Sequence, residues 1–266
     1  MKLVAVTRRS ALRLDDADAA RPDDAPSDKT LVHSTEKLGK RIGELQRVFY
    51  ADARHALLVV LQGRDASGKD GAIRHVFSTV NPQGCVVTSF KAPTELERRH
   101  DFLWRVHQVV PPRGMIGVFN RSHYEDVLVP RVHDELSDEE CERRFREIND
   151  FERMLSEQRV VILKFMLHIS ADEQKRRLNK RLQDPDKNWK FQSIDLDDRS
   201  RWERYTEAYR ALLRATSTSW APWYVVPSDS KKVRSWLIAR RIVDTLEKLD
   251  LRYPPPRPEI AGMEIV

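Results

Sequence analysis

The stretch with the most chemical information spans residues 57–75 and reads LLVVLQGRDASGKDGAIRH. Gly63, Gly68 and Lys69 fit the pattern G-x-x-x-x-G-K, in which glycines let backbone N–H groups turn inward around phosphate oxygens. The lysine adds a positive charge, and a helix beginning at the same point directs its positive dipole end toward the phosphate. The pattern predicts a phosphate-binding loop with the members Gly63, Asp65, Ala66, Ser67, Gly68, Lys69, Asp70 and Gly71.

The position after the lysine departs from this pattern. Asp70 stands where Ser or Thr is usual and where a hydroxyl normally helps to hold Mg²⁺. A carboxylate must then take the metal, and Asp65 is the first candidate. The alternative is a glycine turn with a solvated lysine. We favour the phosphate loop because an apolar run before it is typical of a buried strand, and Ile73 and Phe77 after it share one helix face.

Four polar residues follow the third expected strand, where the sequence reads NRSHYEDV. They can face the phosphate loop, because ligands of open parallel sheets bind beyond the carboxyl ends of the strands. These residues are Asn120, Arg121, Glu125 and Asp126. We predict that Asp126 holds Mg²⁺ together with Asp65 and replaces the missing hydroxyl. The alternative interpretation makes Glu125 and Asp126 an ordinary acidic first turn of a helix.

Basic residues are the third chemical feature. Lys91, Arg121 and Arg131 lie after the second and third expected strands, and arginine forks bind phosphate oxygens in pairs. An insertion of about 171–200 carries a denser group, which is Lys175, Arg176, Arg177, Lys180 and Arg181. We predict a basic lid that closes over a phosphorylated substrate and excludes water. A solvated helix face and a nucleic-acid-binding patch are the alternatives.

Strands and helices alternate along most of the chain. Continuous apolar runs predict strands at 57–61, 85–90, 115–119, 160–169 and 223–226. Three-and-four spacing and capping pairs predict helices at 36–54, 69–77, after Thr94, at 137–158, after Ser170 and at 231–249. This alternation predicts an α/β fold in which a five-stranded parallel sheet lies between two layers of helices.

Composition marks three regions of the chain. Residues 1–35 turn acidic and rich in Ala and Pro without periodicity, which predicts a flexible leader. The domain with its lid insertion occupies 36–253, and 254–266 form a proline-rich tail.

Bulk properties limit the class of protein. The 266 residues carry a formal net charge of +6, and the sequence pI is about 9.3, so an acidic partner or substrate is plausible. Cys85 and Cys141 lie in no Cys/His cluster, which gives no support for a zinc site. No apolar run approaches a signal peptide or a membrane span, and we expect a cytoplasmic protein without a membrane partner.

The motifs together resemble polyphosphate kinase family 2. The matching stretches follow the family's order and are GRDASGKDG, SFKAPT, FNRSHYEDV, LQDPDKNWKF and TSTSWAPWYVVP. The resemblance implies a P-loop kinase fold related to thymidylate kinase, with a helical lid. It also implies reversible phosphoryl transfer between inorganic polyphosphate and AMP or ADP, with Mg²⁺, or Mn²⁺ in its place.

The resemblance assigns roles to individual residues. Asp65 and Lys69 match the family's Walker A acid and lysine, Asp126 its Walker B acid and Arg121 its phosphate-binding arginine. The basic residues of the lid match less closely and are Arg176, Arg177 and Arg181. Members restricted to nucleoside diphosphates tend to read FDRSWYNR at the end of the third strand, whereas this chain has Asn120 and resembles the class that uses both AMP and ADP.

Several expectations about substrates and partners follow from this resemblance. The nucleotide is adenine or guanine, no specific nucleic acid is expected, and the protein forms a homo-oligomer, a dimer or a tetramer. Two other functions stay open. An ATP-dependent nucleotide kinase would use the same loop, and a nucleic-acid-binding NTPase would fit the pI and the basic lid, although no stacking platform or nucleic-acid motif supports it.

Overall fold

The apolar run after residue 55 forms the central strand of a five-stranded parallel sheet. The computed structural model describes residues 1–7, 10–191, 194–260 and 263. The strands are β1 (Ala56–Gln62), β2 (Cys85–Ser89), β3 (Ile116–Asn120), β4 (Val160–His168) and β5 (Trp223–Pro227). Their order across the sheet is β2-β3-β1-β4-β5, and every pair is parallel. The predicted fold class is confirmed.

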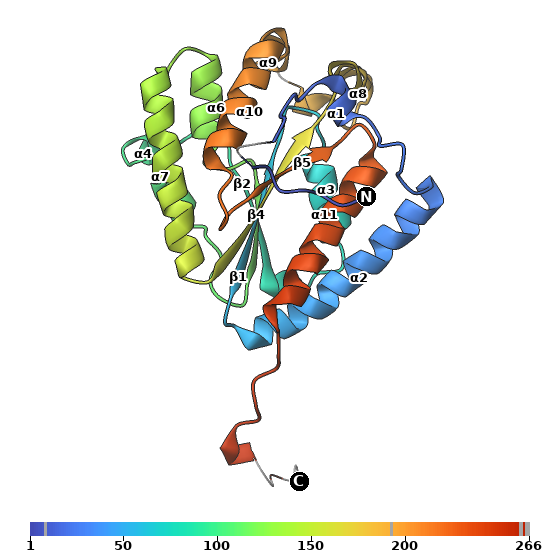
Figure 1. The fold of residues 1–266 in the computed structure, drawn as a ribbon, viewed down its shortest axis with the longest axis vertical. Coiled ribbons are helices and arrows are strands. Elements are labelled where there is room, and N and C mark those ends of the chain that lie inside the picture. Colours follow the sequence, from blue (N-terminus) through green and yellow to red (C-terminus); the bar gives the residue numbers. More distant parts are fainter. Residues whose placement is uncertain (8–9, 192–193, 261–262, 264–266) are drawn as a thin grey trace.

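Two layers of helices cover the sheet (Figure 1). On one face lie α2 (Asp28–Asp52), α3 (Lys69–Val76) and α11 (Lys231–Leu246). On the other lie α6 (Glu125–Val132), α7 (Asp138–Glu157) and α10 (Trp202–Thr216). Each layer packs its own apolar core against one face of the sheet. The central strand β1 is therefore buried along its whole length. The loops at the carboxyl ends of the strands are thereby held by two rigid layers.

The first 35 residues differ from the predicted flexible leader. Val6, Leu12 and Leu14 are buried against the core, and Ala5 forms an antiparallel bridge with Tyr224 of β5. A short helix, α1 (Asp16–Ala19), follows, and α2 already begins at Asp28. Scattered apolar residues in an acidic segment have no periodicity, and so their burial depends on a surface that only the folded domain provides.

The segment after Thr94 contains two short helices rather than one. These are α4 (Glu95–Arg98), which has the predicted capping box of Thr94 and Glu97, and α5 (Trp104–His107). Between them the Asp101 carboxylate accepts a hydrogen bond from the Leu103 N–H (3.0 Å). This local bond replaces the helical pattern and divides the segment.

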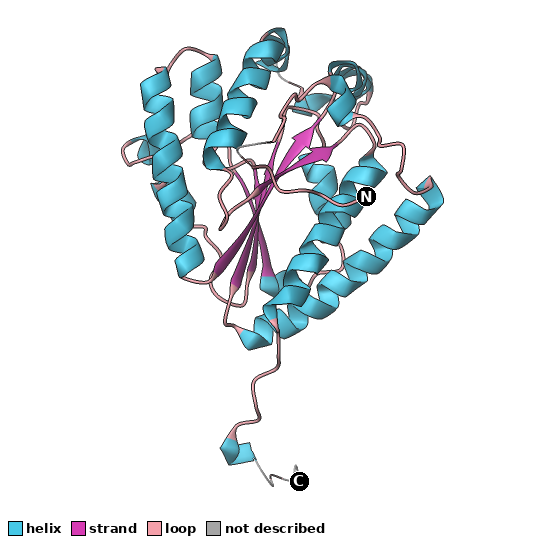
Figure 2. Cartoon of the chain, viewed as in Figure 1, coloured by secondary structure: helices cyan, strands magenta, loops and turns pink. Residues whose placement is uncertain are grey.

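Within the described residues, the insertion after β4 consists of helices joined by short loops (Figure 2). They are α8 (Ala171–Gln183), the 3₁₀ helix η2 (Asn188–Lys190) and α9 (Ile194–Ser200), and α10 then returns to the domain. The remaining 3₁₀ helices are η1 (Pro82–Gly84), η3 (Glu247–Leu249) and η4 (Pro258–Ile260), the last in the proline-rich tail that extends away from the domain. Within the described residues, no helix is both long enough and apolar enough to span a membrane.

Candidate active site

The predicted phosphate loop connects β1 to α3, so strand, loop and helix occur in the expected order. Gly63 and Gly68 have positive φ angles of 151° and 98°. A Cβ at Gly63 would lie 2.5 Å from the Leu167 carbonyl oxygen, and one at Gly68 would lie 2.0 Å from Nη1 of Arg234. Both positions therefore require glycine for conformation and for space.

Lys69 is the first residue of α3, and its side chain folds back into the loop. Its Nζ donates a hydrogen bond to the Gly63 carbonyl oxygen (2.5 Å), and only 8% of the residue is exposed. Burial lowers the pKa of this ammonium, and the nearby Arg121 lowers it further. The lysine charge thus lies at the centre of the loop, where it can neutralise a phosphate held by the N–H groups.

Two arginines whose side chains are largely removed from solvent support the loop from behind. Nη1 of Arg177, on α8, donates to the carbonyl oxygens of Ala66 (2.9 Å) and Ser67 (3.2 Å). Its Nη2 donates to two carbonyl oxygens that follow β5, at 2.7 and 2.8 Å, and its Nε donates to Glu173 (2.7 Å). These bonds use all five N–H groups of the guanidinium. Arg234, on α11, donates to the Ser67 carbonyl oxygen (3.1 Å).

This geometry corrects the role predicted for Arg177. A guanidinium whose N–H groups are all engaged by the protein positions the loop instead of binding a substrate from the lid. The correction has a physical reason. Arg177 lies in the second turn of α8, where the helix still packs on the domain, and not at the far end of the insertion.

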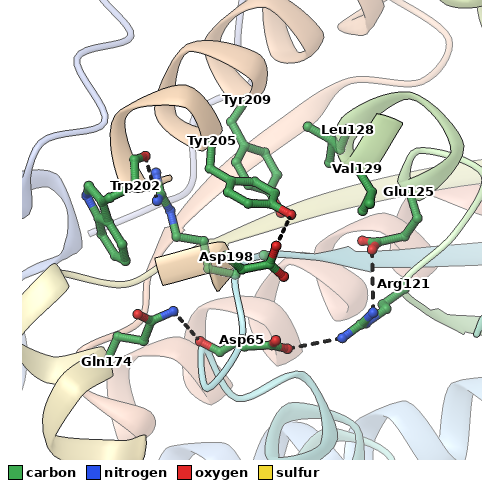
Figure 3. A pocket seen from close by; sticks show the side chains of 12 residues that line it. Asp65, Arg121, Glu125, Leu128, Val129, Gln174, Asp198, Trp202, Tyr205 and Tyr209 are labelled. Carbon is green, nitrogen blue, oxygen red and sulfur yellow. Dashed lines mark hydrogen bonds and ion pairs between the residues drawn. The ribbon is translucent and has the colours of Figure 1, made fainter. Parts of the chain in front are cut away.

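Arg121 is placed between two carboxylates (Figure 3). It leaves β3 with a φ of 61°, and its Nη2 lies 3.0 Å from Oδ1 of Asp65. Its Nη1 lies 3.6 Å from Oε2 of Glu125, and Glu125 is the main reason why the pKa of Arg121 is raised. Burial raises the pKa of Glu125, against the opposing effect of Arg121 and Lys69. The three side chains form a compact charged group beside the phosphate loop.

This group borders a cavity of about 60 Å³ (Figure 3). Aromatic and acidic side chains from α9 and α10 close its other side. The lining residues are Gly63, Arg64, Asp65, Arg121, Glu125, Leu128, Val129, Gln174, Asp198, Trp202, Tyr205 and Tyr209.

Asp126 does not join this group, contrary to the predicted metal pair of Asp65 and Asp126. Both of its carboxylate oxygens accept from Nη2 of Arg105, at 3.1 and 2.9 Å, and Arg144 donates to its carbonyl oxygen (2.5 Å). Burial raises the pKa of Asp126, and Arg105 opposes that effect. Consecutive residues of a helix point about 100° apart. When Glu125 faces the cavity, Asp126 therefore faces α5, and the structure brings Glu125 beside Asp65.

Asn120 connects the end of β3 to the first turn of α3. Its Nδ2 donates to Oδ1 of Asp70 (2.8 Å). Asp70, the departure from the usual loop pattern, is thus placed beside the residue that distinguishes the predicted acceptor class. Gly71 follows in the same turn, and a Cβ there would lie 3.2 Å from Nη2 of Arg234.

The other predicted basic residues lie farther from the cavity lining. Lys91 is exposed after β2, and its carbonyl oxygen accepts from Arg105 (2.8 Å). Arg131 pairs with Asp138 at the start of α7 (2.8 Å). Arg176 is exposed on α8 and bound to Glu173 (2.6 Å), and Arg181 lies one turn farther along the same helix. Of these residues, Arg176 and Arg181 lie on α8, the helix that the sequence predicts as part of the lid.

Sequence reasoning missed the residues of α10 and their contacts with the loop. Arg64 donates to the Trp202 carbonyl oxygen (2.9 Å) and to Oγ1 of Thr206 (2.5 Å), and its guanidinium lies 3.7 Å from the Trp202 ring centre. Burial lowers the pKa of Arg64 to about 10. The spacing of Trp202, Tyr205 and Tyr209 by three and four residues was an available signal for this helix.

Comparison with known proteins gives consistent results. A family model described as Polyphosphate kinase 2 (PPK2) matches residues 26–254. The chain is 52% identical over 229 residues to an AMP/ADP-polyphosphate phosphotransferase of Meiothermus ruber, which covers 86% of this chain and 85% of that protein. It is 44% identical over 231 residues to an ADP-polyphosphate phosphotransferase of Rhodopseudomonas palustris, over 82% of this chain and 80% of the relative. The crystal structure of polyphosphate kinase 2 from Arthrobacter aurescens TC1 superimposes with a TM-score of 0.87 at 38% identity, covering 100% of this chain and 96% of that one.

Proposed function

Because the chain belongs to the polyphosphate kinase 2 family, we propose that it transfers a phosphoryl group between inorganic polyphosphate and a nucleotide. One observation carries this proposal: the family match over residues 26–254 contains the whole phosphate loop, the Arg121–Glu125 turn and the lid. The relatives from Meiothermus ruber and Rhodopseudomonas palustris are named for the same chemistry. The motifs of the sequence predicted this family.

The described residues suit phosphoryl transfer, which needs in-line positioning and stabilisation of charge on the equatorial oxygens. The N–H groups of the loop and Lys69 bind the phosphate that is transferred. Arg121, fixed between Asp65 and Glu125, supplies a second cation next to them. A nucleotide phosphate is already anionic near neutral pH, and so no strong general base is required.

We assign the metal site to Asp65 and Glu125, which both line the cavity. Carboxylate and amide oxygens are the ligands that Mg²⁺ prefers, and Mn²⁺ accepts the same donors. The assignment is supported because both carboxylates line the cavity beside the loop and contact the same arginine, Arg121, whereas Asp126 is absent from the lining and pairs with Arg105. A bound ion would neutralise charge on the phosphates.

The acceptor that we propose is AMP as well as ADP. This finer statement rests on Asn120, which is neutral where diphosphate-specific members carry an acid, and on the name of the Meiothermus ruber relative. A cytoplasmic location and a homo-oligomeric state remain predictions from the sequence, and multi-angle light scattering of the purified protein measures the second.

The test is an assay with polyphosphate, Mg²⁺ and either AMP or ADP, without ATP. We expect AMP to give ADP and then ATP, and ADP to give ATP, resolved by anion-exchange chromatography. Polyphosphate replaced by ATP serves as the control for an ATP-dependent nucleotide kinase. Phosphorylation that requires ATP and ignores polyphosphate would refute the proposal.

A further inference from the structure

A cluster of charged and polar side chains is buried between the sheet and the layer formed by α7 and α10. Lys164 of β4 donates to Oε2 of Glu152 on α7 (2.5 Å) and to the Thr216 carbonyl oxygen (2.8 Å). Both side chains of this ion pair are fully buried, at 0% and 1% exposure. Burying two charges costs desolvation energy that their attraction only about offsets. Net stability alone therefore does not account for the pair.

The cluster is connected to the active-site turn by two adjacent residues. The Tyr124 hydroxyl accepts from Lys164 (2.8 Å) and donates to Oε1 of Glu152 (2.8 Å). Nε2 of His123 lies 3.3 Å from the same Glu152 oxygen. Tyr124 and His123 are also fully buried. The ion pair is thus bonded to the two residues directly before Glu125.

The turn that these residues hold is strained. Arg121 has a φ of 61°, in the left-handed region that non-glycine residues rarely adopt. Such a conformation persists only when surrounding contacts fix it. On one side, Ser122 Oγ accepts from Gln62 (3.1 Å). On the other side, Tyr124 and His123 contact the ion pair.

We propose that the buried Lys164–Glu152 pair is a positioning device: through Tyr124 and His123 it holds the Arg121–Glu125 turn so that Glu125 faces Asp65 and the phosphate loop. None of the four side chains lines the cavity, and so their effect on the reaction is indirect. The inference rests on the proposed function only where its test measures kcat and KM in the polyphosphate assay.

The test begins with Tyr124→Phe, which removes one hydroxyl and leaves the ion pair intact. In the polyphosphate assay with AMP we expect kcat to fall about tenfold or more, with the KM of both substrates changed by less than about threefold, because misplaced groups affect the transition state most. Leu155→Val is the matched control, since it shortens a buried apolar side chain on the same helix as Glu152 that takes no part in these hydrogen bonds. It should lower Tm and leave kcat at 25 °C unchanged.

A double-mutant cycle with Glu125→Gln distinguishes positioning from an independent effect. If the hydroxyl acts through Glu125, the added loss from Tyr124→Phe in the Glu125→Gln background falls below about threefold. A full additional loss, or a Tyr124→Phe variant that lowers Tm but keeps kcat within about twofold, would overturn the inference. An inactive wild-type protein would refute the proposed function instead.

Crystal structures of the wild type and of Tyr124→Phe provide a readout that does not depend on activity. We expect the Arg121–Glu125 segment to shift, and an unmoved segment would contradict the inference. His123→Gln removes the second connection and replaces Tyr124→Phe if that variant does not fold. Failure of both to fold, where Leu155→Val folds, would assign the cluster to stability alone.

Discussion

At the residue scale, the site depends on a few charged side chains whose neighbours determine what they can do. Lys69 is buried inside the loop, Arg121 lies between two acids, and Asp126 is engaged by Arg105. Adjacent acids at the start of α6 therefore have different partners. Three predictions belong to this scale.

Lys69→Ala should lower kcat by about 10²-fold or more, because the transferred phosphate loses the cation nearest to it. Circular dichroism should show an intact fold. Arg74→Ala removes an exposed charge farther along the same helix and is the control. Activity of Lys69→Ala within a few-fold of the control would exclude the loop from catalysis.

Glu125→Gln and Asp65→Asn should raise the Mg²⁺ concentration needed for half-maximal activity, since each removes a proposed metal ligand. Asp126→Asn changes the same charge on the neighbouring residue, where it faces Arg105, and should leave the Mg²⁺ midpoint unchanged. Shifted midpoints for Asp65→Asn and Asp126→Asn, with that of Glu125→Gln unchanged, would restore the metal pair that the sequence predicted.

The acid side of the pH–rate profile should depend on Glu125. Burial raises its pKa, so the ionised form that binds metal is lost at a higher pH than for an exposed glutamate. Activity should therefore fall as the pH decreases through this raised pKa. The Glu125→Gln profile lacks the contribution of this carboxylate, and an identical acid limb in both proteins would contradict the assignment.

At the element scale, α8 has two functions along its length. Its first two turns hold the phosphate loop, because Gln174 donates to the Asp65 carbonyl oxygen (3.1 Å) and Arg177 to those of Ala66 and Ser67. The later turns carry Lys180 and Arg181, which belong to the lid that the sequence predicts. A movement of the lid must therefore occur beyond Arg177 if the loop is to stay in place.

Arg177→Ala and Lys180→Ala separate these functions, since Lys180 is exposed in the third turn of α8. The first leaves buried carbonyl oxygens without donors and should destabilise the protein by about 1–3 kcal/mol. The second removes an exposed side chain and should leave Tm nearly unchanged, while it raises the KM for polyphosphate and weakens the salt dependence of that KM. Urea denaturation and KM values at two salt concentrations measure both effects. Equal Tm values for the two variants would contradict the division.

At the scale of the whole molecule, the N-terminal segment is part of the domain. It adds Val6, Leu12 and Leu14 to the core beside β5, and the carbonyl oxygen of Arg13 accepts from Nε of Arg210 on α10 (2.7 Å). The segment therefore connects the edge strand with the helix that closes the cavity.

Leu14→Ala should destabilise the protein by about 2–4 kcal/mol, because Leu14 is only 4% exposed and its truncation leaves a cavity. Val4→Ala, at a position that is 80% exposed, should change stability by less than about 0.5 kcal/mol. Urea denaturation of both variants measures the difference, and equal midpoints would return the segment to a flexible leader.

The sequence by itself determined the phosphate loop, the five strands and the family. Gly63, Gly68 and Lys69 act through backbone geometry and charge within seven consecutive residues, and a buried strand is marked by a continuous apolar run. Both features can therefore be predicted from short stretches of sequence. The family motifs also predicted the function we propose, because they can be recognised in the sequence without knowledge of the tertiary contacts.

Only the tertiary structure decided which charges meet. Whether Glu125 or Asp126 faces Asp65 depends on the rotation of α6 against its neighbours, and neighbouring acids look equivalent in a sequence. Arg177 belongs to a basic run, but four of its five hydrogen bonds go to carbonyl oxygens more than 50 residues away in the chain. The burial of Leu14 likewise requires a surface assembled from distant strands and helices. Contacts of this kind depend on where packing places each side chain, and local spacing does not encode that.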